Sequence, residues 1–372
     1  MSKSFDYQLI DEYQLEITSY CNAACPQCPR NMQGHGINPY MPLTHLSREV
    51  IDQTFDKELC QRLRQVFFCG SYGDPIMHPD FLGILRDFRS KNPTLWLYFH
   101  TNGGVHEPEY WAEVAKIMNG YGQIDFGIDG LEDTLQLYRK NVKFSKAIEN
   151  AAAYINAGGR AQWNFIVFKH NEHQIEAVQN LGKELGFFNI MIRRTGRFFN
   201  HQTLEEMSEW PVHKGEALKL PTDKQYHNNS MLYLPKLKEQ YADMRDYFST
   251  TEISCDALNG NKVAINAEGL VLPCNFLNHN LYDVRFYQDA LPGANALSTV
   301  NGKNQVRSFL ESYGLENISI KHHTLPEIFA SPMWADLVNS FSCSLDNGRL
   351  FECAMTCGSK LRKVWDQTGV KK

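Results

Sequence analysis

The sequence lacks a long hydrophobic run and an apolar segment near its N-terminus. No apolar stretch approaches the ~18 residues that a membrane-spanning helix needs, and the opening residues MSKSFD contain no signal region. These absences argue against a membrane partner and predict a cytoplasmic protein. No internal repeat or low-complexity tract is evident either.

An excess of positive charge is also missing. The 372 residues carry a formal net charge of −5, and the sequence pI is about 6.2. A protein that mainly binds nucleic acid would show a basic domain, so the composition argues against a nucleic-acid partner. Hydrophobic residues make up 43% of the chain, which is enough for one large or two ordinary packed domains.

Cysteine is absent from the long central part between Cys69 and Cys255. The ten cysteines gather in three groups, three at 21–28, two at Cys60 and Cys69, and five between 255 and 357. In a cytoplasmic chain such groups indicate metal ligands or structural thiols rather than disulfides. Cys60 lies in a helical pattern and Cys69 ends an apolar run, so we predict that both are structural.

The first group has the spacing C-x3-C-x2-C, formed by Cys21, Cys25 and Cys28 directly after the β-prone run Tyr13–Ile17. Three thiolates on one short loop can hold three irons of a cubane cluster and leave the fourth iron for another ligand. Prolines within the loop keep it irregular. A zinc knuckle is the alternative, but a lone C-x2-C pair would leave zinc incompletely ligated. The spacing therefore favours a [4Fe–4S] cluster.

Short apolar runs alternate with helical patterns up to about residue 200. The runs are Tyr13–Ile17, Val66–Cys69, Trp96–His100, Ile124–Ile128, Trp163–Phe168 and Ile190–Ile192. Helical periods cover 111–118, 148–155 after a Ser145 cap, and 175–185 before Gly186. Such β-then-α units predict an α/β fold with a parallel sheet, either open or closed into a barrel. Chemistry in these folds collects at the carboxyl ends of the strands.

Short polar turns stand at those strand ends. Gly70–Pro75 follows the second run, Thr101-Asn102-Gly103 the third, and Ile128-Asp129-Gly130 ends the fourth. Together with the cysteine loop, these turns resemble the radical S-adenosylmethionine (radical SAM) enzymes, whose fold is a partial (β/α)6 TIM-like barrel. The resemblance implies that the open iron binds SAM and that a 5′-deoxyadenosyl radical abstracts a substrate hydrogen. It also implies an external one-electron reductant such as flavodoxin or ferredoxin.

The resemblance assigns further residues to SAM. Gly73, Asp74 and Pro75 match the family's G-G-E-P element, which holds the SAM amino group, although Tyr72 and Asp74 replace its Gly and Glu. The T-N-G turn places Thr101 and Asn102 near the SAM ribose or carboxylate. Two positions depart from the family, since Gln27 replaces an aromatic residue that touches adenine and Gly127 replaces a common serine.

Asp129 and a basic run remain open to several roles. Asp129 is a candidate for ribose binding, for a catalytic base, or for the cap of the next helix. Arg193, Arg194 and Arg197 suit a carboxylate of SAM or of a substrate, or else form a solvated surface. We assign Arg194 to the cofactor.

The last third of the chain suggests a second metal region. Residues 201–250 form a polar bridge with one predicted short helix at Thr203–Met207. A β-hairpin signal follows over Lys262–Leu272, and a helical period starts at Pro332. The cysteines of this region are Cys255, Cys274, Cys343, Cys353 and Cys357.

These cysteines and the hairpin resemble the SPASM extension of radical SAM enzymes or its shortened twitch form. The full form needs about seven or eight cysteines, so five predict the twitch form with one auxiliary [4Fe–4S] cluster. Its ligands would be Cys255, Cys274 and two of Cys343, Cys353 and Cys357. A structural zinc site is the alternative. The expected domains are a barrel at 1–200, a bridge at 201–250 and a small α+β auxiliary domain at 251–372.

The resemblance leaves the substrate open. We expect modification of a peptide or protein, with the electron returned through the auxiliary cluster, because the polar 201–250 segment offers room for an extended ligand. The alternative is a small-molecule dehydrogenase that uses Arg193, Arg194 or Arg197. A zinc-binding interaction protein is a further alternative, but it leaves the three strand-end turns unexplained.

Overall fold

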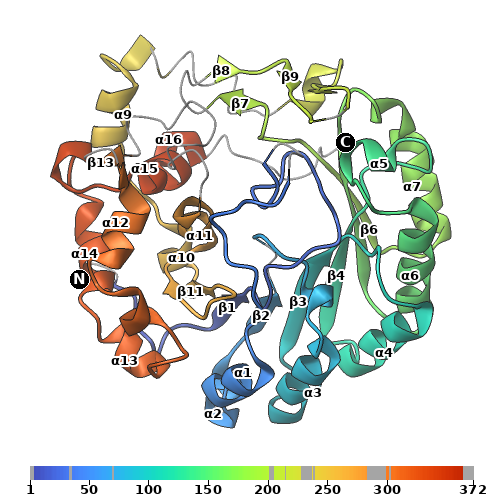
Figure 1. Ribbon diagram of the computed structural model, residues 1–372, viewed down its shortest axis with the longest axis horizontal. Helices are drawn as coiled ribbons and strands as arrows, with labels where there is room; N and C mark the ends of the chain where they lie inside the picture. The colour runs from blue at the N-terminus through green and yellow to red at the C-terminus, as the bar shows by residue number, and fades with distance from the viewer. Residues whose placement is uncertain are drawn as a thin grey trace.

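The structure, a computed structural model, describes residues 4–32, 36–68, 71–200, 205–213, 215–227, 237, 239–282, 299–300 and 303–362. Its central sheet contains β1 (Glu12–Leu15), β2 (Gln65–Phe68), β3 (Trp96–Thr101), β4 (Gly122–Gly127), β5 (Ala161–Ile166), β6 (Asn189–Arg193), β11 (Lys262–Ile265) and β12 (Val271–Leu272). The strand order is β12-β11-β1-β2-β3-β4-β5-β6, and β1 to β6 run parallel (Figure 1). The prediction of a parallel α/β sheet is confirmed, and every predicted run is a strand.

Helices cover the outer, convex face of this sheet (Figure 1). They include α1 (Arg48–Thr54), α2 (Lys57–Arg62), α3 (Phe81–Lys91), α4 (Pro108–Met118), α5 (Leu135–Tyr138), α6 (Phe144–Asn156) and α7 (Ile175–Glu184). Aromatic pairs attach α3 and α4 to the sheet. The ring centroids of Phe81 and Phe99 lie 5.1 Å apart, and those of Trp111 and Phe126 lie 5.3 Å apart. Packing of apolar helix faces on alternate strand residues therefore builds the core.

The inner face of the sheet is polar. The Asp125 carboxylate accepts hydrogen bonds from Tyr98 Oη (2.6 Å), Gln162 Nε2 (2.9 Å) and Asn164 Nδ2 (3.0 Å). The side chain of His100 on the same face is 43% exposed, whereas Phe99 on the outer face is fully buried. Parallel strands are usually apolar on both faces, so this layer of mutually hydrogen-bonded polar side chains departs from the usual pattern.

The predicted C-terminal ends of α6 and α7 are confirmed, whereas the predicted start of α6 is wrong. Gly158 and Gly186 adopt left-handed backbone angles, with φ of 89° and 84°, just beyond α6 and α7. The prediction that Ser145 caps α6 is wrong, because the helix begins at Phe144 after Lys143 and no side chain caps it. Phe144 packs against the core, and its burial moves the helix start toward the N-terminus.

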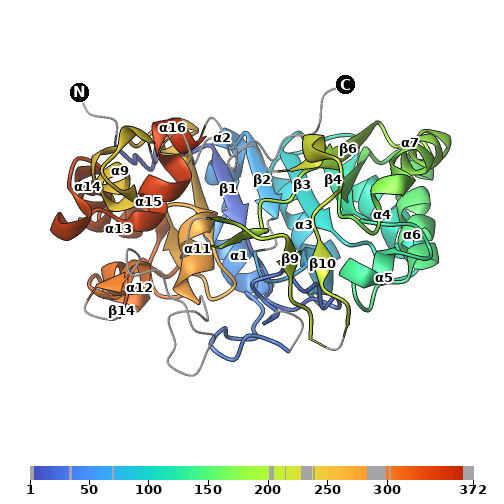
Figure 2. The same ribbon diagram turned by 90° about the horizontal axis from the view of Figure 1, so that it is seen from above.

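The predicted C-terminal hairpin is confirmed, and it joins the central sheet. Strand β11 pairs antiparallel with β12 and parallel with β1, with Glu12 opposite Lys262. Gly269 at the hairpin turn has φ of 87°, a conformation that favours glycine. The barrel sheet is thus extended by a strand from the last third of the chain (Figure 2).

The bridge contains short strand pairs in place of the predicted helix. Strand β7 (Phe199–Asn200) pairs with β8 (Glu205–Glu206), so the predicted Thr203–Met207 helix is wrong over its described part. Pairing with β7 extends this backbone, and Met207 N donates to Phe198 O at 3.0 Å. Residues 201–204 and Cys69 lie outside the described residues. Strand β9 (Glu209–Trp210) pairs with β10 (Leu218–Lys219).

Short helices pack beside the hairpin in the C-terminal part (Figure 1). They are α9 (Met244–Thr250), α10 (Asp256–Asn259), α11 (Asn275–Leu281), α12 (Gln305–Glu311), α13 (Leu325–Phe329), α14 (Met333–Ser340), α15 (Phe351–Cys357) and α16 (Ser359–Arg362), with the strand pair β13 (Thr299–Val300) and β14 (Lys303–Asn304). The predicted helix after Pro332 is confirmed as α14. No helix among the described residues is long and apolar enough to cross a membrane.

Candidate active site

The loop that follows β1 carries three cysteines on the concave side of the sheet (Figure 1). Cys25 is 5% exposed, and Cys21 and Cys28 are half-buried. The loop closes on itself through a hydrogen bond from Cys28 N to Cys25 O at 3.0 Å. Burial raises the pKa of the Cys21 and Cys25 thiols, and the nearby Asp74, Cys25 and Cys28 raise that of Cys21 further. Metal binding would therefore have to displace thiol protons.

Asp74 joins two of the predicted strand-end turns. Its Oδ2 atom accepts from Thr101 Oγ1 (3.0 Å), Asn102 N (2.9 Å) and Asn102 Nδ2 (2.8 Å). Asn102 Nδ2 also lies 3.8 Å from Cys21 Sγ. Burial raises the pKa of Asp74 to about 6, although these hydrogen bonds oppose the shift. The structure thus brings the cysteine loop and both turns into one site.

Gly73 must be glycine at this position. A Cβ atom there would lie 1.9 Å from Thr18 O, which is a severe clash with the backbone after β1. The close approach lets Gly73 N and Tyr72 N donate to one carboxylate oxygen of Glu16, at 3.1 and 2.5 Å. Pro75, which follows Asp74, is buried. The predicted Gly73-Asp74-Pro75 element is therefore a rigid turn against the cysteine loop.

Asp129 does not cap the next helix, because α5 begins at Leu135 after Thr134. Its carboxylate is fully buried and both oxygens have partners, Arg139 Nε at 2.6 Å and Ile166 N at 2.6 Å. Arg139 extends further and places Nη1 3.8 Å from Cys25 Sγ. The Ile128-Asp129-Gly130 turn after β4 is thus connected to the cysteine loop through the side chain of Arg139.

The three arginines at the end of β6 and just beyond it have three separate hydrogen-bond partners. Arg193 Nε donates to Asn164 Oδ1 at 3.0 Å on the inner sheet face, and Arg194 Nε donates to Gln225 O at 2.7 Å in the bridge. Arg197 Nη1 donates to Gln27 O in the cysteine loop. They do not form one carboxylate site, and Arg194, which we assigned to the cofactor, faces the bridge instead.

Gln27 contains an unsatisfied buried donor. The residue is 5% exposed, its Oε1 accepts from Thr195 Oγ1 at 3.4 Å, and its Nε2 has no hydrogen-bond partner among the residues that the structure describes. An unpaired buried donor costs about 1–3 kcal/mol, so such an atom suits a site that a ligand completes. Ring nitrogens of adenine are acceptors of the required kind. The residues around the loop thus fit SAM as well as an iron–sulfur cluster.

Comparison with known proteins agrees with this geometry. The sequence model of the Radical SAM superfamily matches residues 15–181, which include all three loop cysteines. Residues 15–181 form a radical SAM domain. This domain implies SAM and a [4Fe–4S] cluster as its cofactors.

Similar proteins extend the likeness beyond this domain. A tungsten-containing aldehyde ferredoxin oxidoreductase cofactor-modifying protein from Pyrococcus furiosus is 23% identical over 310 residues, which cover 78% of each chain. Streptococcus suis SuiB bound to its precursor peptide SuiA superposes with a TM-score of 0.52 at 12% identity, over 96% of this chain and 73% of SuiB. Native anSMEcpe with AdoMet and the Kp18Cys peptide also gives 0.52, at 14% identity over 96% and 92%. These two structures share the fold.

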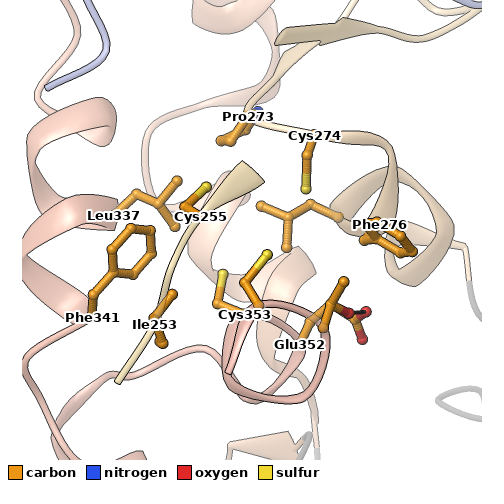
Figure 3. A pocket seen from close by; sticks show the side chains of 12 residues that line it. Ile253, Cys255, Pro273, Cys274, Phe276, Leu337, Phe341, Glu352 and Cys353 are labelled. Carbon is orange, nitrogen blue, oxygen red and sulfur yellow. Dashed lines mark hydrogen bonds between the residues drawn. The ribbon is translucent and has the colours of Figure 1, made fainter. Parts of the chain in front are cut away.

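A second group of thiols lines a pocket outside the radical SAM domain. Its cysteines are Cys255, Cys274, Cys353 and Cys357. Figure 3 shows the sulfur atoms of Cys255, Cys274 and Cys353 directed into the same space. Cys357 is hydrogen-bonded to Cys255, and burial raises the pKa of Cys274 to about 12. Four thiols in one pocket fit a [4Fe–4S] cluster or a zinc ion.

Apolar side chains complete the walls of this pocket, among them Leu337 of α14 and Phe341 directly after it (Figure 3). Cys343 does not line it, since its Sγ donates to Asn339 O at 3.6 Å one turn back. In the part of the chain that the structure describes, neither cysteine group is drawn together to metal-coordination distance.

Glu16 connects the radical SAM domain with the helix that follows Cys274. One carboxylate oxygen accepts from the Tyr72-Gly73 turn, and the other accepts from Asn278 Nδ2 of α11 at 3.0 Å. Tyr72 Oη donates to the carbonyl of His279 at 2.8 Å on the same helix. Tyr72, which departs from the family pattern, therefore links the Gly73-Asp74-Pro75 turn to the helix that follows Cys274.

Glu16 and Arg139 were not predicted from the sequence. Glu16 follows the last residue of β1 and is 3% exposed, so an acidic residue within an apolar run was the available signal. Arg139 follows the Ile128-Asp129-Gly130 strand end after one short helix. Nothing in its spacing indicated that it returns to Cys25.

Proposed function

We propose that this chain is a radical SAM enzyme that cleaves SAM reductively and removes a hydrogen atom from a substrate. One observation carries this proposal: Asp74 and Asn102 unite the three-cysteine loop with the two strand-end turns. This arrangement is unexplained for a zinc-binding interaction protein, which needs no polar turns beside its thiols.

Each residue of the loop site has a proposed task. Cys21, Cys25 and Cys28 hold a [4Fe–4S] cluster. When bound, the cluster supplies one electron from a reductant such as flavodoxin or ferredoxin, and SAM supplies the 5′-deoxyadenosyl radical. Asp74 orients Asn102 and, with Gly73, Pro75 and Thr101, forms the wall that receives the methionine end and ribose of SAM. Asp129 acts by positioning Arg139, since both of its carboxylate oxygens are already bonded.

We further propose one auxiliary [4Fe–4S] cluster held by Cys255, Cys274, Cys353 and Cys357. Support comes from the shared pocket and from the place of Cys343 outside it. The auxiliary domain of the twitch type would then occupy residues 251–372, after the barrel at 1–200 and the bridge at 201–250. Burial of the thiols among apolar residues would limit solvent access to the cluster.

The proposed substrate is a peptide or protein side chain or backbone. Support comes from the two structures of the same fold that contain bound peptides and from the polar inner face of the sheet, where the side chain of His100 is 43% exposed. A small-molecule dehydrogenase is a second candidate, because the relative from Pyrococcus furiosus is named for modifying a cofactor. Arg193, beside Asp125 on the inner face, would suit an anionic group of such a molecule.

The test is the iron and sulfide content of anaerobically reconstituted protein, with EPR spectra and an assay for 5′-deoxyadenosine. We expect about eight irons in the parent, and about four in a Cys21, Cys25, Cys28→Ala triple variant that no longer cleaves SAM. About four irons in the parent and none in the triple variant would leave zinc or bare thiols in the second pocket. No iron in either protein would contradict the radical SAM proposal.

The substrate class needs a separate measurement. Deuterated cell extract is separated by size into macromolecular and small-molecule fractions, and each is incubated with enzyme, SAM and reductant. Transfer of deuterium into 5′-deoxyadenosine from the macromolecular fraction alone supports a peptide or protein. Transfer from the small-molecule fraction alone supports the dehydrogenase.

A further inference from the structure

Arg139 lies between a buried carboxylate and a thiol of the cysteine loop. Its Nε atom is 2.6 Å from Asp129 Oδ2, and its Nη1 atom is 3.8 Å from Cys25 Sγ. The arginine side chain is 23% exposed and the aspartate is fully buried. Nitrogen-to-sulfur contacts are longer than those to oxygen, so this distance permits an N–H···S hydrogen bond.

Two neighbours hold the guanidinium in this position. A Cβ atom on Gly127 would lie 2.5 Å from Arg139 Nη2, so a larger residue there would displace the arginine. Ile166 N donates to the second oxygen of Asp129 and fixes the carboxylate that the arginine binds. The glycine that departs from the family pattern thus provides the space that Arg139 requires.

The backbone also ties this segment to the loop. Ala24 N donates to Lys140 O at 3.1 Å, one residue beyond Arg139 and one before Cys25. The segment that carries Arg139 is therefore attached to the loop next to the contact with sulfur. A positive charge in this fixed place is oriented before any cofactor binds.

We propose that Arg139 sets the reduction potential of the cluster that Cys25 ligates, through a charge-assisted N–H···S bond. This inference rests on the proposed function. One electron passes from the external reductant to the cluster, so the reduced cluster carries one more negative charge than the oxidised one. A guanidinium beside a ligand sulfur stabilises that added charge, and hydrogen bonds to sulfur are known to tune such potentials. Arg139 is thus a positioning residue that makes the cluster easier to reduce.

The experiment is an EPR-monitored redox titration of the reconstituted full chain without SAM. The relevant signal is the one missing from the Cys21, Cys25, Cys28→Ala variant. In Arg139→Gln we expect the ratio of reduced to oxidised cluster at a fixed potential to fall about tenfold, as one lost charge-assisted hydrogen bond can cause. Arg139→Lys keeps the charge and should recover part of the loss. Gly127→Ser, which displaces the guanidinium, should change the ratio in the same direction.

Arg197→Gln is the matched control, because Arg197 donates to the carbonyl of Gln27 in the same loop and to no thiol in the described contacts. Its ratio should stay within about twofold of the parent, less than a single lost hydrogen bond produces. The SAM affinity of each variant, measured by equilibrium dialysis, shows separately whether the substitution affects SAM binding.

Three outcomes would overturn the proposal. The first is an unchanged ratio in Arg139→Gln with intact iron content and unchanged SAM affinity. The second is an equal change in Arg197→Gln, which would indicate a general charge effect. The third is an unchanged ratio with lost SAM affinity, which would assign Arg139 to SAM. Absence of the signal from the parent would instead contradict the proposed function itself.

Discussion

The two cysteine groups are built in opposite ways. The first places three thiols within one loop, and polar or charged side chains such as Asn102 and Arg139 contact them. The second collects four thiols around a pocket whose other walls include Leu337 and Phe341. The contrast indicates that the first site is arranged to exchange charge with a ligand. The second is lined mainly by apolar side chains, with Glu352 and Thr356 among its other lining residues.

The largest predicted effect is a difference in SAM cleavage between variants of the two cysteine groups. Cys25→Ser removes a ligand of the first cluster and should abolish reductive cleavage of SAM. Cys353→Ser should remove about four irons and leave cleavage without substrate intact, because the second cluster is not needed for the first step. The measurement is 5′-deoxyadenosine formation with dithionite. Equal loss in both variants would mean that the two groups act as one centre.

A second prediction concerns Glu16, which connects the two regions. Burial raises the pKa of Glu16 from 4.5 to about 7, against the hydrogen bonds from Tyr72, Gly73 and Asn278. The folded state therefore binds this proton more tightly than the unfolded state does. The resulting stabilisation, up to about 3 kcal/mol, is present below pH 4.5 and is lost as the pH rises through 7.

Urea unfolding of the metal-free protein at several pH values between about 5 and 8 provides the measurement, because this range spans the loss of stability around pH 7. Glu16→Gln cannot titrate and should show a flatter pH dependence of the free energy of unfolding. Equal slopes in the parent and the variant would contradict the raised pKa.

Substitution of Gln27 should have two smaller effects, a gain in stability and a loss of SAM affinity. Gln27→Leu keeps a similar size and removes the unpaired Nε2 donor. The metal-free protein should become about 1 kcal/mol more stable, whereas SAM should bind about tenfold more weakly. Thermal unfolding and equilibrium dialysis measure the two quantities. Weaker SAM binding without added stability would show that the donor already has a partner in the free protein.

The smallest effect should come from Cys343, the fifth C-terminal cysteine. Because it does not line the pocket, Cys343→Ala should leave the iron content and EPR spectrum unchanged. Cys274→Ala is the matched comparison and should lose about four irons. A loss of iron in Cys343→Ala would require a different set of ligands.

The sequence predicted the order of strands and helices well, because apolar periods and glycine stops are local signals. Every strand of the parallel set and the turn at Gly269 follow from such patterns. The contact of Arg139 with Cys25 and that of Glu16 with Asn278 could not be predicted in this way. They join residues far apart in the sequence, and a charged residue at an inner position has no periodic pattern of its own. The prediction of a cap at Ser145 failed for a related reason, because the start of α6 depends on the packing of Phe144 against the core.

The pairing of β1 with β11 also constrains how the protein can fold during synthesis. One edge of β1 stays without its partner until Lys262–Ile265 has left the ribosome. Contacts between such distant residues form slowly, and an unpaired strand edge is prone to associate with other chains. The nascent barrel is therefore an aggregation-prone intermediate for most of its translation. Expression at low temperature or with a chaperone that shields strand edges should raise the yield of folded protein.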